Sequence, residues 1–266
     1  MIQTSISMIG ILLFWSSLYA IIYQFVIHQN EVSMVSLIKT ILFGHYHMWY
    51  LYVMVGLYLI TPILKVIIKK EHQQLIKYLL GLAIIFTFVI PLVNYFFQIV
   101  VESISITKLI NKVHFEMIGS YLTYYILGWY VTNFEVKHKK VIYALGVLST
   151  VFTILMTQIT KNYDFFYDTS LITILLLSVA IFIFIFDYSK KLKLKDTTIK
   201  LLSILSKLTF GVYLIHILVL YYISRYVMIS NVLIECIVVF ILTVIISFVI
   251  SFILSKIAYV KKLIKC

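Results

Sequence analysis

The sequence has few charged residues and few residues that break helices. Of its 266 residues only 12% are charged, and there are 8 glycines, 2 prolines and 2 cysteines. Soluble domains carry about 25% charged residues, so this composition excludes a soluble enzyme. The scarcity of glycine and proline excludes collagen-like and disordered chains and leaves little room for the repeated turns of a β-barrel. Two cysteines are too few for a disulfide framework or a paired zinc motif.

Long apolar runs make up most of the chain. Hydrophobic residues account for 63% of it, and the mean hydropathy is +1.07. A helix that crosses the hydrocarbon core needs about 20 mostly apolar residues. The runs of this kind cover residues 6–27, 47–64, 76–99, 115–132, 141–159, 170–186, 208–226 and 232–255. We therefore expect an all-α, polytopic membrane helix bundle with about eight transmembrane helices, forming a single membrane-embedded domain over residues 1–266.

The basic residues alternate between the two sides of these runs. Of the 22 lysines and arginines, 17 lie in the loops after the second, fourth and sixth runs and in the C-terminal tail. The other five are Lys39, Lys108, Lys112, Lys161 and Arg225. Because cytoplasmic loops are enriched in lysine and arginine, we expect both termini in the cytoplasm. This distribution explains the net charge of +12 by a lipid bilayer partner, without nucleic acid.

The second run opens with a histidine-rich segment, HYHMWY, at residues 45–50. The residues expected to share one helical face from there are His47, Tyr50, Tyr58 and Thr61. Polar side chains inside a bilayer are functional candidates, so this face is expected to line an interior surface. The alternative is a hydrated interfacial histidine beside aromatic anchors such as Trp49. No metal site is expected, because side chains two residues apart on one helix point about 200° apart and no third ligand is indicated.

A polar stripe leads into the seventh run. Its members, Ser203, Ser206, Thr209, Tyr213 and His216, follow one another at intervals of three or four residues. Such a stripe on an apolar helix should face protein or water. The last member lies about 12 Å along the helix from residue 208, near mid-membrane. It is a candidate for catalysis or substrate binding, and the alternative is a hydrogen bond between helices.

Two weaker candidates lie elsewhere in the chain. Asn94 follows Pro91 near the outer end of the third run, and Glu116 opens the fourth run. The favoured alternative for Asn94 is that it satisfies backbone groups that the proline leaves unpaired. Glu116 is close enough to the membrane interface to be solvated.

Several segments resemble the acyltransferase type 3 family of integral membrane proteins. His47–Leu51, running into Gly56–Pro62, resembles one family segment, and Phe210–His216 resembles another late in the chain. Between them, Tyr121–Tyr130 and Phe165–Phe186 are similar to intervening family segments. Their order and spacing agree along nearly the whole chain.

The resemblance implies a bundle of about ten spans in the bacterial plasma membrane. Such a protein transfers an acyl group, commonly acetyl from acetyl-CoA, to a hydroxyl of a cell-surface or lipid-linked carbohydrate, without a bound cofactor. The partners implied are acyl-CoA, the carbohydrate acceptor and the bilayer. We expect His47 and His216 to be catalytic. The residues expected to contact substrate are Trp49, Tyr50, Tyr58, Asn94, Glu116, Ser206 and Tyr213.

The sequence departs from the family at its start. Family members carry a basic residue in the first span and a histidine eleven positions later, whereas no histidine here has Lys or Arg at that distance before it. Ile11–Gln24 resembles the third family span instead. We therefore expect an N-terminally incomplete domain that lacks the first two spans and, in this short form, the usual general base. Two alternatives stay open, a transporter or export partner for polysaccharide or amino acid, and a non-enzymatic truncated remnant.

Overall fold

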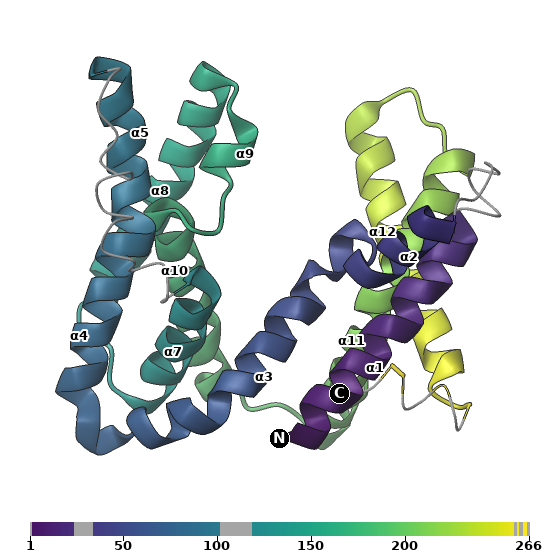
Figure 1. Cartoon of the computed structure of the whole chain (residues 1–266), viewed down its shortest axis with the longest axis horizontal. Coiled ribbons are helices and arrows are strands. Elements are labelled where there is room, and N and C mark those ends of the chain that lie inside the picture. The colour runs from purple at the N-terminus through teal and green to yellow at the C-terminus, as the bar shows by residue number, and fades with distance from the viewer. Residues whose placement is uncertain (1, 24–33, 102–118, 258–259, 261–262, 265–266) are drawn as a thin grey trace. The chain divides into compact units, whose positions relative to one another are not determined.

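The described part of the protein is mostly helical. The computed structural model describes residues 2–23, 34–101, 119–257, 260 and 263–264, and these contain no β-strand (Figure 1). The α-helices are α1 (Ile2–Ile21), α2 (Met34–Phe43), α3 (Trp49–Ile67), α4 (Gln73–Ala83), α5 (Ile90–Val100), α7 (Ser120–Asn133), α8 (Lys139–Thr160), α9 (Tyr163–Phe166), α10 (Ile172–Lys191), α11 (Asp196–Tyr226) and α12 (Val232–Leu254). The expected all-α fold is confirmed.

Two compact units make up the chain. The first unit combines Met1–Pro62 with Leu194–Cys266, and the second comprises Ile63–Lys193. The first unit therefore contains α1, α2, most of α3, α11 and α12. The second contains the end of α3 and the helices from α4 to α10. Residues far apart in the sequence thus meet within the first unit, because its halves come from opposite ends of the chain.

Six described segments are long and apolar enough to cross a membrane. They are Leu37–Ile67, Lys70–Val100, Lys139–Thr160, Ile172–Lys191, Asp196–Tyr226 and Val232–Leu254. The first and fourth predicted runs also lie on helices, but Ile6–Ile21 is shorter and α7 has 14 residues. Helices satisfy their own backbone polar groups, which the hydrocarbon core requires. The chain is a multi-pass membrane protein, and the number of eight spans stays a prediction.

Helix extends into two stretches that lay outside the predicted runs. α2 occupies part of residues 28–46, between the first two runs. α10 continues to Lys191 and α11 begins at Asp196, so most of residues 187–207 is helical. Leucine and lysine, which dominate this stretch, are good helix formers in water as well. Hydropathy therefore located the membrane-crossing part of each helix but underestimated its length.

The helix containing Pro91 is continuous but not regular. A π-helical segment, η4 (Ile84–Val89), joins α4 to α5 directly before the proline. Proline lacks an N–H donor and its ring clashes with a regular preceding turn. A π-bulge is a common way for a helix to absorb such an irregularity.

Close contacts fix the middle of α11 within the first unit. A Cβ at Gly211 would contact the Ser251 hydroxyl of α12 and lie 3.2 Å from its Cβ, so glycine permits this approach. The Ser251 hydroxyl donates to the Leu208 carbonyl at 3.0 Å. From α1, the Tyr19 hydroxyl donates to the Leu214 carbonyl at 2.9 Å. These contacts hold in place the part of α11 that carries the candidate site.

Candidate functional site

The chain departs from helical geometry just before the histidine-rich segment. Gly44 has a φ of +67°, a left-handed conformation that favours glycine. His45 is extended, with φ −75° and ψ 150°, and a 3₁₀ turn, η2 (Tyr46–Met48), then leads into α3. The rings of His45 and His47 meet, with their Nδ1 atoms 2.9 Å apart. The prediction that these rings diverge is wrong, because the two residues do not lie on one continuous helix.

The ring of His47 is buried, and one of its nitrogens lacks a hydrogen bond. His47 is 6% exposed, and no described group meets hydrogen-bond geometry at its Nε2 atom. The Leu214 carbonyl lies near this ring and also accepts the hydroxyl of Tyr19. A buried polar atom without a partner costs about 1–3 kcal/mol. Such an atom calls for a functional explanation.

Residues of α11 complete the group around His47. The Tyr213 hydroxyl donates to the His47 backbone carbonyl at 2.6 Å. The His216 ring lies perpendicular to the His47 ring, with their centroids 5.5 Å apart. His47 and His216 were both predicted site residues, and the structure brings them together with Tyr213 across 169 positions of sequence. We call His45, His47, Tyr213 and His216 the histidine cluster.

The hydrogen bonds of the cluster constrain which nitrogens carry protons. His216 Nδ1 lies 2.7 Å from the Tyr213 carbonyl. A carbonyl only accepts, so this nitrogen carries the proton, and in the neutral ring Nε2 has the lone pair. Between His45 and His47, one Nδ1 donates and the other accepts. When His47 is the donor, its buried Nε2 has a lone pair that can accept a proton.

Aromatic rings pack around the histidine cluster. Tyr19 of α1 is fully buried, and its ring centroid lies 4.9 Å from that of His47. The Tyr23 and Tyr46 rings each lie 4.5 Å from the His45 ring. Sequence analysis missed Tyr19 and Tyr23 as neighbours of the site. The available signal was their spacing of four residues, which places two hydroxyls on one face of an apolar helix.

The aromatic residues predicted beside His47 lie at different depths. The Tyr50 ring is 5.6 Å from that of Tyr213 and thus adjoins the cluster. Trp49 is 50% exposed and its ring contacts that of Tyr50. Tyr58, further along α3, is half-buried and packs against the apolar core of the first unit.

The remaining predicted residues do not join the cluster. Ser206 is exposed and lies about 10 Å along α11 from Tyr213. Asn94 belongs to α5 in the second unit. Glu116 lies outside the residues that the structure describes. The polar stripe on α11 therefore supplies the site only through Tyr213 and His216.

Comparison with known proteins identifies the family. A family model described as an acyltransferase domain matches residues 10–256, which is nearly the whole chain. No curated protein and no solved structure matches the chain. The matched range includes every member of the histidine cluster and all six membrane-crossing segments. The chain therefore belongs to the acyltransferase type 3 family of membrane proteins.

Proposed function

We propose that this protein is a membrane O-acyltransferase of the bacterial plasma membrane. It transfers an acyl group, typically acetyl, from acyl-CoA to a hydroxyl of a cell-surface or lipid-linked carbohydrate. The observation that carries the proposal is the buried, unpartnered Nε2 of His47 beside His216, in a chain of an acyltransferase family. A histidine nitrogen within reach of a substrate hydroxyl is suited to general base catalysis.

His47 acts as the general base in this mechanism. The acceptor hydroxyl donates its hydrogen bond to Nε2, and the proton moves to that nitrogen as the hydroxyl oxygen attacks the thioester carbonyl. The tetrahedral intermediate then collapses, the carbon–sulfur bond breaks, and the CoA sulfur takes the proton from His47. The products are the acyl ester and free CoA. A positioned general base contributes about 10²–10⁴ to the rate.

Neighbouring groups position the base. The Nδ1–H group of His47 donates a hydrogen bond to Nδ1 of His45, 2.9 Å away. The lone pair of the neutral His47 ring is then on its Nε2. The Tyr213 hydroxyl anchors the His47 backbone. His216 presents its own Nε2 lone pair close to His47 and offers a second acceptor for the substrate hydroxyl.

The proposal is tested by acetyl transfer in membranes. Membranes containing the protein are incubated with radiolabelled acetyl-CoA, and label in the carbohydrate fraction of the cell envelope is counted. We expect His47→Gln to lower the transfer rate by about 100-fold or more. His138→Asn is the matched control, because His138 is exposed, belongs to the second unit and has a φ of 54°, which Asn tolerates.

Two results would overturn the proposal. One is full transfer activity in a folded His47→Gln protein, which would remove His47 from the mechanism. The other is the absence of labelled carbohydrate above the level of membranes without the protein. That result would instead favour a role in transport or export.

A further inference from the structure

Two neighbouring cavities lie between α7 and α10 in the second unit, and together we call them the groove. One cavity, of about 300 Å³, lies between the end of α7, the loop after it and the last turns of α10. The other, of about 200 Å³, lies between earlier turns of the same two helices. Val131 lines both. Together they reach the size of a small-molecule site, about 300–1,000 Å³. We call the larger cavity the mouth and the smaller one the inner cavity.

The inner cavity presents an apolar surface. The two hydroxyl-bearing side chains that line it, Tyr124 and Ser178, both donate to backbone carbonyls. Gly128 also lines it, and a Cβ added there would meet nothing within 4 Å. The cavity therefore has room beside Gly128 and suits a hydrocarbon chain.

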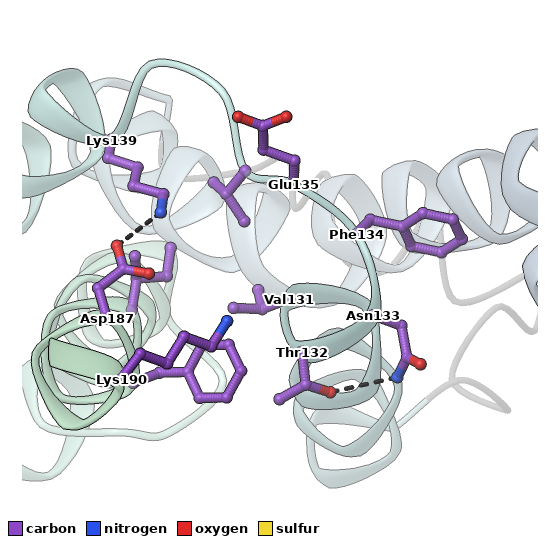
Figure 2. Close-up of a pocket in the computed structure, with 11 residues that line it drawn as sticks. Val131, Thr132, Asn133, Phe134, Glu135, Lys139, Asp187 and Lys190 are labelled. Atoms are coloured by element: carbon purple, nitrogen blue, oxygen red, sulfur yellow. Dashed lines mark hydrogen bonds and ion pairs between the residues drawn. The ribbon is translucent and has the colours of Figure 1, made fainter.

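The mouth contains a lysine that forms no ion pair with a described carboxylate, although its charge acts on the Asp187 carboxylate. Lys139 and Asp187 neutralise each other through an ion pair of 2.6 Å. The Lys190 ammonium lies 3.8 Å from the centre of the Phe186 ring, and no ion pair joins it to a described carboxylate. Figure 2 shows the Lys190 side chain turned toward Val131, with the exposed Glu135 carboxylate on another side of the mouth. Lys190 is thus placed to contact an anionic group in the mouth.

The surroundings of the mouth are strongly basic. Residues 134–140 and 187–195 contain seven lysines and two acidic residues. Lysine-rich ends of membrane helices face the cytoplasmic leaflet, whose anionic lipids attract them. The net positive charge of these two segments therefore favours a phosphate-bearing ligand over a cationic one.

The dimensions of the groove match one leaflet of a bilayer. Its lining residues on α10 extend from Ser178 to Lys190, a distance of about 18 Å at 1.5 Å per residue. Half of the hydrocarbon core measures about 15 Å. The Phe182 ring lines the inner cavity and the Phe186 ring lines the mouth, and the two rings are parallel with their centroids 6.1 Å apart. A ligand here would have a charged end at the mouth and a chain along the inner cavity.

We propose that this groove binds an anionic glycerophospholipid of the leaflet at its lysine-rich end. The lipid phosphate contacts Lys190, and one acyl chain passes Phe186 and Phe182 to lie beside Gly128. The proposal does not rest on the reaction proposed above, because the groove lies in the second unit and the histidine cluster in the first.

Binding is measured with the purified full chain in detergent by native mass spectrometry. The probe is dioctanoyl-phosphatidylglycerol, and dioctanoylglycerol has the same chains without the phosphate. Octanoyl-CoA tests whether an acyl donor, which also joins a phosphate to a chain, occupies the groove instead. We expect phosphatidylglycerol to bind, dioctanoylglycerol to bind at least about fivefold more weakly, and octanoyl-CoA to displace the lipid only weakly.

Two variants test the two ends of the groove separately. Lys190→Gln should weaken phosphatidylglycerol binding about fivefold, with Lys191→Gln as the control outside the cavity lining. Gly128→Leu should fill the inner cavity and weaken binding about tenfold. Gly81→Leu is its control, because Gly81 is also helical and has open space at its Cβ, but does not line the groove. Circular dichroism establishes that each variant is folded.

Three outcomes would overturn the proposal. Equal binding of dioctanoyl-phosphatidylglycerol and dioctanoylglycerol would show that Lys190 does not bind the lipid phosphate. Unchanged binding in both the Lys190→Gln and Gly128→Leu proteins would place the lipid elsewhere. Displacement by octanoyl-CoA at lower concentrations than phosphatidylglycerol itself would make the groove an acyl-donor site.

Discussion

The hydrogen bond between His45 and His47 makes a prediction about catalysis that neither residue alone would suggest. In the proposed mechanism His45 touches no substrate and acts by holding the Nδ1 proton of His47, 2.9 Å away. His45→Phe keeps a ring among the tyrosines but removes the acceptor. The proton of His47 is then free to move to Nε2, where it blocks the lone pair that the acceptor hydroxyl needs.

The size of the effect follows from the bond that is lost. A neutral hydrogen bond contributes about 0.5–1.5 kcal/mol net, and leaving its buried partner unsatisfied costs about 1–3 kcal/mol. At 1.36 kcal/mol per factor of ten, the transfer rate should fall about tenfold. This loss is smaller than that expected for His47→Gln, because the base itself is still present. His45→Asn should recover most of the rate, since its amide oxygen can accept the same proton.

The rates are compared at saturating acetyl-CoA in the membrane transfer assay, with thermal unfolding in detergent as a measure of stability. A positioning role predicts a lower kcat with little change in KM for acetyl-CoA. The reasoning is refuted when His45→Phe transfers at the rate of the unmodified protein. It is also refuted when His45→Asn and His45→Phe lose the same amount of rate at equal stability, because a general loss of packing would then explain both.

Two further predictions concern α11. Gly211→Val should destabilise the first unit by about 1–3 kcal/mol, because the added side chain overlaps Ser251. Thermal unfolding measures this loss. The control is Gly56→Val, at an open position, which should leave the unfolding midpoint nearly unchanged. Tyr213→Phe removes the 2.6 Å hydrogen bond to the His47 carbonyl and should lower the transfer rate about three- to tenfold. An unchanged rate would show that this hydrogen bond does not position the base.

Membrane-crossing helices were predictable because their signal is local. Each of the eight apolar runs lies on a helix in the described part of the chain, and six helical segments there are long enough to span. The boundaries were less predictable. α11 begins at Asp196, twelve residues before the run that revealed it, because helix formation outside the membrane depends on propensity rather than hydropathy.

The candidate site was predictable residue by residue but not as an arrangement. His47, Tyr213 and His216 stood out as polar residues in apolar segments, and they do meet. The stripe on α11 suggested Ser206 equally strongly, yet that residue is exposed. Periodicity identifies a face of a helix, but only the packing of α1 and α3 decides which part of that face is covered.

The sequence by itself determined that this is a helical membrane protein of an acyltransferase family and that two histidines are candidates for its chemistry. These conclusions depend on composition, on local periodicity and on short motifs. Only the tertiary structure decided that His45 pairs with His47, because the left-handed Gly44 interrupts the helix that the spacing suggested. It also decided that α7 and α10 leave a groove with a lysine at its mouth. The groove arises from packing between helices distant in sequence, and the histidine pair from a local backbone conformation that side-chain periodicity does not record.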